Sequence, residues 1–226
     1  MTRSVKTKIG LMGGTFDPIH LGHMRAAEEI KEILNLDRIC FVPSRVPPHK
    51  NSDNISKTSD RLNMLKLALG DIPYFDIDEF ELTRNTTSYT IDTLTHLTYH
   101  HPDSEFYFIV GNELFKDIDT WKKYEELFKT ANFIVLARPG VEQNNSDLLP
   151  LALKSQFRYY KGSGESKSYV NKDGKLVIFT QINGLKISST EIRNLVKENK
   201  SITNLVPPGV EKYIIGNKLY ITEADQ

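Results

Sequence analysis

The sequence predicts a doubly wound α/β fold with a mostly parallel sheet. Apolar runs typical of buried strands lie at 8–12, 38–43, 105–110 and 133–137. Stretches with helical periodicity follow them at about 21–34, 60–69, 88–99 and 121–130. Strands that alternate with helices pair in parallel, because right-handed crossovers return the chain to the same end of the sheet. Ligands of such sheets bind at the carboxyl edge, so the loops that follow the strands are the expected location of a ligand site.

The first strand runs directly into the segment GGTFDPIHLGH, residues 13–23. Glycines let the backbone approach an anion closely, and the start of the next helix adds N–H donors and a positive dipole end. His20 and His23 are three residues apart, so they share a helix face and can reach the same phosphate chain. A plain helix start, with Asp17 as N-cap and Pro18 beside it, leaves both histidines unexplained. The segment therefore predicts a nucleotide-phosphate site.

A second candidate anion site lies in ISSTEIR, residues 187–193. Ser188 and Glu191 have the spacing of a capping box, which by itself is an ordinary helix start. The box does not explain the hydroxyls of Ser188, Ser189 and Thr190, with Arg193 one turn inside the helix. Hydroxyls and a guanidinium at a helix N-terminus favour a second phosphate cradle.

Three further segments carry weaker signals. PSRVPPHK, residues 43–50, has a stiff proline loop that presents Lys50 as a cation, although a solvated basic loop has the same composition. RNTTSYTIDTL predicts a helix with Ser88 as N-cap, and its first turn offers the N–H groups of Tyr89 and Thr90 to an anion. Trp121 is predicted to open the helix at 121–130, where its spacing is typical of a core anchor.

Composition narrows the class of protein. Lys plus Arg and Asp plus Glu are both 29, so no global basic charge indicates a nucleic-acid partner. The lone Cys40 lies in an apolar run and excludes a disulfide framework. The first eight residues are too short and polar for a signal peptide, and no apolar run reaches the roughly 20 residues of a membrane span. We expect a cytoplasmic protein with small-molecule partners, of unknown oligomeric state.

The 226 residues are expected to form one domain, because no linker separates two halves. Residues 143–175 form a variable surface segment in this interpretation, and its polar part KGSGESKSYVNKDGK is expected to be mobile. Pro207 and Pro208 open a last amphipathic helix, which gives the fold a small helical C-terminal portion.

Taken together, GGTFDPIHLGH, PPHK, SYTIDTL and ISSTEIR resemble the motifs of bacterial nicotinate-nucleotide adenylyltransferases, a family of the nucleotidyltransferase superfamily. The resemblance implies a Rossmann-like nucleotidyltransferase fold and transfer of AMP from ATP to nicotinate mononucleotide, with Mg²⁺, in NAD biosynthesis. It implies catalytic roles for His20, His23 and Arg193. It also implies an ATP site, in which the ISSTEIR residues hold the β- and γ-phosphates, made of Gly13, Gly14, Thr15, Phe16, His20, His23, Ser188, Ser189 and Arg193.

The same resemblance implies a nicotinate mononucleotide site made of Thr15, Lys50, Ser88, Tyr89, Thr90, Gly111 and Trp121. In that site Lys50 binds the substrate phosphate, the turn at Tyr89 and Thr90 binds the carboxylate, and the indole stacks on the pyridine ring. One position departs from the family pattern, because Glu113 stands where the family usually has Asp.

The implied reaction needs no general base, since a phosphate monoester with a second pKa near 6 is already ionised at neutral pH. The sequence agrees, because it has no evident nucleophile-base pair and no Cys-x-x-Cys or His-Glu-x-x-His metal motif. Two alternatives stay open. The chain is an adenylyl- or cytidylyltransferase for another phosphate monoester, such as phosphopantetheine, or it is a nucleotide-binding module of the same fold without turnover.

Overall fold

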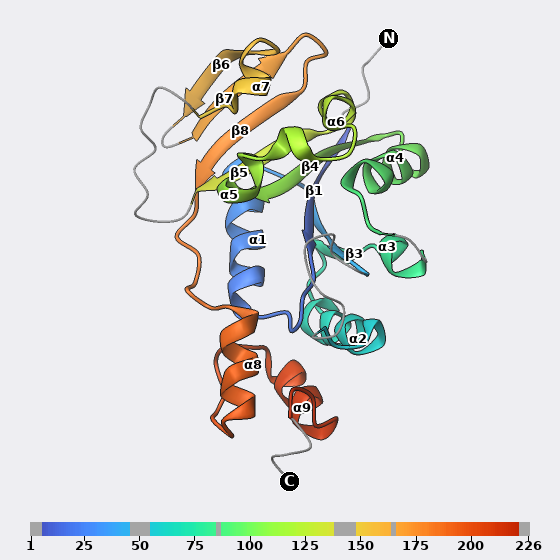
Figure 1. Ribbon diagram of the computed structural model, residues 1–226, viewed down its shortest axis with the longest axis vertical. Helices are drawn as coiled ribbons and strands as arrows, with labels where there is room; N and C mark the ends of the chain where they lie inside the picture. Colours follow the sequence, from blue (N-terminus) through green and yellow to red (C-terminus); the bar gives the residue numbers. More distant parts are fainter. Residues whose placement is uncertain (1–5, 46–54, 85–86, 138–147, 164–165, 222–226) are drawn as a thin grey trace. The chain divides into compact units, whose positions relative to one another are not determined.

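A computed structural model of the chain describes residues 6–45, 55–84, 87–137, 148–163 and 166–221 (Figure 1). Its strands are β1 (Thr7–Gly14), β2 (Arg38–Pro43), β3 (Phe75–Ile77), β4 (Ser104–Gly111), β5 (Asn132–Ala137), β6 (Phe157–Ser163), β7 (Ser166–Asn171) and β8 (Leu176–Gln181). They form one sheet in the order β3-β2-β1-β4-β5-β8-β7-β6. β4 pairs in parallel with both β1 and β5, and β5 pairs in parallel with β8. The predicted mostly parallel α/β fold is confirmed.

The helices are α1 (Leu21–Leu34), α2 (Thr58–Leu69), α3 (Phe80–Thr83), α4 (Thr90–His100), α5 (Asn112–Phe115), α6 (Tyr124–Thr130), α7 (Leu151–Lys154), α8 (Ser189–Lys197) and α9 (Pro208–Gly216), with a short 3₁₀ helix η2 (Ile118–Thr120). The predicted helix at 121–130 is shorter than expected, because α6 begins only at Tyr124. The predicted C-terminal helical portion corresponds to α8 and α9. Within the described residues, no helix is long and apolar enough to cross a membrane.

Two compact units make up the chain. The first comprises Met1–Gly13, Leu34–Ile39 and Tyr89–Asn183, and the second comprises Gly14–Ile33, Cys40–Ser88 and Gly184–Gln226. Both are discontinuous in sequence, so each gathers segments that lie far apart along the chain. The expectation of a single domain over residues 1–226 stays a prediction.

An aromatic core stabilises the first unit. The rings of Phe128 and Phe133 lie 4.6 Å apart, and Phe115 packs edge-on against Phe179 at 5.7 Å. All four side chains are buried. Gly10 in β1 belongs to the same tight packing, because a Cβ there would lie 2.5 Å from the Ile39 side chain. A buried sheet that is this densely packed holds the carboxyl ends of its strands in fixed positions.

The described residues of 161–175, which were predicted to form a mobile surface segment, lie in strands or in the turn that follows them, and the variable surface segment at 143–175 stays a prediction. β6 and β7 pair antiparallel with each other, and β7 pairs antiparallel with β8, so this region extends the sheet (Figure 1). Tyr169 packs against Phe179 at 5.8 Å and against Tyr159 at 5.9 Å, and both Tyr159 and Tyr160 on the edge strand β6 are exposed. Residues 158–162 are all exposed, which explains the polar composition of this edge of the sheet. Residues 143–147 and 164–165 lie outside the described residues.

In the second unit, the C-terminal helix packs on α2. The Tyr213 hydroxyl on α9 donates to Asp60 Oδ1 at 2.9 Å and accepts from Asn63 Nδ2 at 3.0 Å. The start of α1 is held in the same unit, because the Leu21 N–H donates to the Leu205 carbonyl at 2.9 Å. The C-terminal segment is thus an integral part of this unit rather than an appendage.

Candidate nucleotide-binding site

The loop between β1 and α1 has the sequence GTFDPIH, residues 14–20, and we call it the GTFDPIH loop. Phe16 has a left-handed backbone, with φ of 50°, and its ring is buried. The ring packs against Phe41 at 5.6 Å and edge-on against His23 at 5.2 Å. Gly14 makes room for it, because a Cβ at that position would lie 2.9 Å from the ring. Packing therefore fixes the course of the loop and gives Gly14 a structural requirement.

Carbonyl oxygens at the start of the loop are bound by protein donors. Gly14 O accepts from the Ser44 N–H at 2.9 Å and from Ser44 Oγ at 3.3 Å. Thr15 O accepts from Arg61 Nη1 at 2.7 Å. In a planar trans peptide, the N–H group points away from its own carbonyl. The N–H groups of Thr15 and Phe16 consequently point away from these donors.

The later carbonyls of the loop are bound by the ISSTEIR segment. Arg193 Nη1 donates to Asp17 O at 2.7 Å, and Ser189 Oγ donates to Pro18 O at 2.8 Å. The two segments that the sequence predicted as phosphate sites are therefore brought together, although 171 residues separate Pro18 from Ser189. Ser188 is the N-cap of α8, as predicted, and its Oγ accepts from the backbone N–H three residues later at 3.1 Å.

His20 and His23 lie side by side at the start of α1. Their rings stack with centroids 3.6 Å apart and an interplanar angle of 21°. Each Nδ1 accepts the backbone N–H of the other residue at 3.3 Å, which leaves the proton of each neutral ring on Nε2. Burial lowers the pKa of His20 to about 4, and burial followed by the His20 charge lowers the pKa of His23 to about 3. At neutral pH the pair thus presents two uncharged Nε2–H donors.

Asp17, Arg61 and Tyr220 have contacts around the loop that the sequence did not predict. Asp17 is not the N-cap of α1, which begins at Leu21. Its buried carboxylate accepts instead from the Ser56 N–H at 3.1 Å and from the Tyr220 hydroxyl at 2.8 Å. Arg61 is only 1% exposed, and burial lowers its pKa. In the sequence Arg61 looks like a surface charge of α2, and no local signal distinguishes it.

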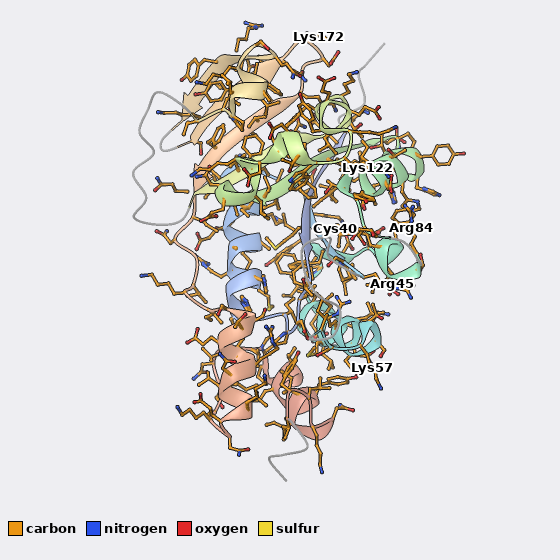
Figure 2. All side chains as sticks on the ribbon, viewed as in Figure 1. Cys40, Arg45, Lys57, Arg84, Lys122 and Lys172 are labelled. Carbon is orange, nitrogen blue, oxygen red and sulfur yellow. The ribbon has the colours of Figure 1, made fainter. Side chains whose placement is uncertain are left out.

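Two basic residues connect the PSRVPPHK and RNTTSYTIDTL segments. Arg45 Nη1 donates to the Arg84 carbonyl at 2.8 Å, and the Arg84 guanidinium lies 5.1 Å from the ring centre of Phe80 (Figure 2). Arg61 also donates to the Ser44 and Arg45 carbonyls, at 2.8 and 3.2 Å. This loop is therefore tied to the same buried arginine as the GTFDPIH loop. Lys50 lies outside the described residues.

The helix start that was predicted to bind a carboxylate differs in detail. Ser88 is not the N-cap of α4, because the helix begins at Thr90 and Tyr89 occupies the cap position without a side-chain cap. Ser88 Oγ is instead buried without a hydrogen-bond partner among the described residues. Lys122 Nζ lies 4.3 Å from the centre of the Tyr89 ring and 3.5 Å from Asp92 Oδ2 (Figure 2). The structure thus places a cation beside this helix start.

Trp121 is not part of a helix, because it follows η2 and precedes α6. Its half-buried ring packs edge-on against Phe108, with centroids 6.1 Å apart. A Cβ on Gly13 would also make ordinary contact with Phe108, at 3.8 Å. Gly111 ends β4, and a Cβ there would lie 3.5 Å from the carboxylate of Glu113. In the first unit, Phe108 and Trp121 thus form an aromatic pair, and the Glu113 carboxylate lies beside the end of β4.

Comparisons with known proteins bear on the family and the fold of the chain. A family model described as cytidylyltransferase-like matches residues 11–195. The chain is 40% identical over 214 residues to proteins named "Probable nicotinate-nucleotide adenylyltransferase" from Geotalea daltonii and Pelobacter propionicus, which covers 94% of this chain and 98% of each relative. A solved structure of Plasmodium falciparum nicotinic acid mononucleotide adenylyltransferase complexed with NaAD is 23% identical, with a TM-score of 0.69 over 95% of this chain and 97% of that one. At that identity, the structural likeness supports the fold.

Proposed function

Because the chain belongs to the cytidylyltransferase-like family, and within it to the nicotinate-nucleotide adenylyltransferases, we propose that it transfers AMP from ATP to nicotinate mononucleotide. The products are nicotinate adenine dinucleotide and pyrophosphate, and the reaction belongs to NAD biosynthesis. The observation that carries the proposal is the GTFDPIH loop, whose carbonyls are bound by protein donors next to two stacked, neutral histidines.

In this proposal, a phosphate oxygen of the mononucleotide attacks the α-phosphorus of ATP, and the bond to the β-phosphate oxygen breaks. No general base is needed, since the attacking phosphate is already ionised at neutral pH. The Nε2–H groups of His20 and His23 donate to oxygens of the α- and β-phosphates. Preorganised neutral donors of this kind stabilise the charge that develops in the transition state.

ATP binding in this proposal also uses Gly13, Gly14, Thr15 and Phe16 through the backbone, and Ser188, Ser189 and Arg193 at the β- and γ-phosphates. Two observations support it. The peptide planes of Thr15 and Phe16 are oriented by bound carbonyls, and Arg193 is held beside Asp17 by a 2.7 Å hydrogen bond. A guanidinium fixed in this way has further N–H groups with which to bind phosphate oxygens.

For the mononucleotide we propose Thr15, Lys50, Ser88, Tyr89, Thr90, Gly111 and Trp121. The buried Ser88 hydroxyl, which has no hydrogen-bond partner among the described residues, supports this assignment, because buried polar groups normally have a partner. The first N–H groups of α4 lack intrahelical acceptors and suit a carboxylate. The half-buried indole of Trp121 suits stacking on a pyridine ring.

Within the described ranges, no group of three or more His, Cys, Asp or Glu side chains could hold a metal ion. The residues around the GTFDPIH loop are mainly N–H donors, which bind phosphate oxygens rather than cations. We propose that Mg²⁺ arrives with ATP, held by phosphate oxygens and water, and neutralises phosphate charge when bound.

Pyrophosphate release, measured with ATP or CTP against a panel of phosphate acceptors, tests the proposal. The expected result is turnover with ATP and nicotinate mononucleotide. A preference for phosphopantetheine or for CTP would indicate another transferase of the family, and nucleotide binding without release would indicate a non-catalytic module. The helix start should also favour the acid over nicotinamide mononucleotide, because its N–H donors offer nothing to the NH₂ of the amide. Equal kcat/KM values for the two acceptors would contradict the substrate assignment.

The remaining expectations are a cytoplasmic location and small-molecule partners without nucleic acid. The equal counts of acidic and basic residues support the second of these. The buried thiol of Cys40 is consistent with a reducing compartment.

A further inference from the structure

Tyr220 lies four residues beyond the end of α9 and is fixed in place. The segment after the helix folds back on it, because the N–H groups of Lys218 and Leu219 donate to the carbonyls of Ile215 and Ile214 at 3.1 and 3.0 Å. The Tyr220 hydroxyl donates to Asp17 Oδ1 at 2.8 Å, across 203 residues of sequence. The C-terminal segment thereby makes direct contact with the GTFDPIH loop.

We propose that Tyr220 is a positioning residue for nucleotide binding, acting through the Asp17 carboxylate on the GTFDPIH loop. The inference rests on the proposed function, since it assigns the loop to ATP. Asp17 is 3% exposed, and both of its carboxylate oxygens are engaged, one by Tyr220 and the other by the Ser56 N–H. Its carbonyl is bound by Arg193. The side chain and the backbone of Asp17 are thus held by three segments outside the loop, at Ser56, Arg193 and Tyr220.

The loop needs this support because of Phe16, the residue that precedes Asp17. Phe16 has φ of 50°, a conformation that costs a bulky residue energy and persists only where the surroundings hold it. The contacts of Asp17 hold one side of that residue, and the Arg61 contact with Thr15 O holds the other. Without the Tyr220 hydroxyl, the buried carboxylate would have one donor fewer, and the loop could relax away from the phosphate-binding geometry.

Tyr220 is equipped for a donor role. Burial, followed by the charge and hydrogen bond of Asp17, raises the pKa of Tyr220, so the phenol keeps its proton at neutral pH. A purely stabilising role is the competing explanation. The chain offers a matched comparison, because Tyr213 also donates from the C-terminal region to a carboxylate, Asp60, at 2.9 Å, but that contact lies on α2 and not on the loop.

The test compares Tyr220→Phe with Tyr213→Phe. Each variant loses one phenol-carboxylate hydrogen bond, and Tyr213→Phe also loses the hydrogen bond from Asn63 Nδ2, so both should lower Tm by about 2–8 °C. Only Tyr220→Phe should weaken binding of an ATP analogue with a methylene group between the α- and β-phosphorus, by roughly tenfold, and speed hydrogen exchange of the loop amides. KM for nicotinate mononucleotide should stay within about twofold in both variants.

Unchanged analogue affinity in Tyr220→Phe, with a Tm loss equal to that of Tyr213→Phe, would overturn the proposal and leave a structural contact only. Asp17→Asn provides a second measurement, because an amide has a single oxygen and cannot accept from both the Tyr220 hydroxyl and the Ser56 N–H. It should weaken analogue binding at least as much as Tyr220→Phe, and wild-type affinity in this variant would also overturn the proposal. Analogue binding does not depend on the acceptor. A wild-type protein that binds the analogue but does not react with nicotinate mononucleotide would therefore refute the proposed function alone.

Discussion

Gly22 is the position where a single methyl group should disturb catalysis without removing any catalytic group. It is the second residue of α1 and lies between the two histidines. A Cβ there would lie 3.0 Å from His20 Nδ1, 3.1 Å from His20 Cε1 and 3.3 Å from the Leu185 carbonyl oxygen. The Leu185 oxygen belongs to the backbone, so the imidazole has to give way, by a few tenths of an ångström. The ring is stacked on His23 and hydrogen-bonded to it, so the pair must move together.

Misplacement of a catalytic group by about 1 Å costs roughly 100-fold in rate, so a shift of half that size predicts a loss in kcat of roughly tenfold for Gly22→Ala. Stability should change little. Alanine gains about 1 kcal/mol of helix propensity over glycine, which offsets a steric cost of similar size, and Tm should stay within about 4 °C of wild type.

Gly209→Ala is the matched control, because Gly209 is also the second residue of a helix, α9. A Cβ there would make ordinary contacts with Leu67, at 3.6 Å or more, so nothing has to move. We expect unchanged kcat and an equal or higher Tm for this variant. Steady-state kinetics and thermal unfolding of both variants decide the matter. A Gly22→Ala enzyme with kcat within twofold of wild type would show that the observed position of the histidines is not the one that limits turnover.

Three further predictions concern charged and titratable groups. The folded-state pKa values of His20 and His23, about 4 and 3, lie below the ordinary 6.5, so the unfolded chain binds more protons than the folded one. Stability should therefore be lost as pH falls from 6.5 toward 4. Tm measured against pH should fall less steeply in the double variant His20→Asn with His23→Asn. Arg193→Lys should raise KM for ATP roughly tenfold and leave KM for the mononucleotide unchanged, because lysine lacks the planar fork, and equal losses for both substrates would contradict this role. Lys122→Met should lower the ratio of kcat/KM for nicotinate mononucleotide to kcat/KM for nicotinamide mononucleotide about two- to fivefold. Lys123→Met removes the neighbouring charge and should leave this ratio unchanged.

The parallel core of the sheet could be predicted from sequence because its signal is local. Runs such as 105–110 and 133–137 are continuously apolar, and helical periodicity separates them. The hairpin of β6 and β7 was missed for the opposite reason. Glycine, serine and lysine in 161–175 reduce the apparent hydrophobicity, but a solvent-exposed hairpin at the edge of a sheet needs few apolar residues. Composition therefore misled where periodicity was weak.

The candidate site could be predicted only where its residues form contiguous motifs. His20 and His23 are recognisable from their spacing, and the structure places their rings side by side. Arg61, Asp17 and Tyr220 were missed because their contacts join distant segments, and no pattern in a single sequence links residue 17 to residue 220. The ends of short helices were also hard to predict, since both Ser88 and Trp121 lie just outside the helices assigned to them.

The donors that bind the GTFDPIH loop explain why the geometry of this site cannot be predicted from the loop sequence alone. Its carbonyls are bound by Ser44 at the end of β2, by Arg61 on α2, and by Ser189 and Arg193 on α8. A loop that binds an anion through its N–H groups must turn its carbonyl oxygens away, and each carbonyl that is turned away from solvent needs a donor elsewhere. Because three separate elements supply those donors, the observed course of the loop forms only when these parts of the second unit are folded. In the proposed ATP site, the short motif supplies the groups that would meet the phosphate, and the rest of the unit fixes the direction in which they point.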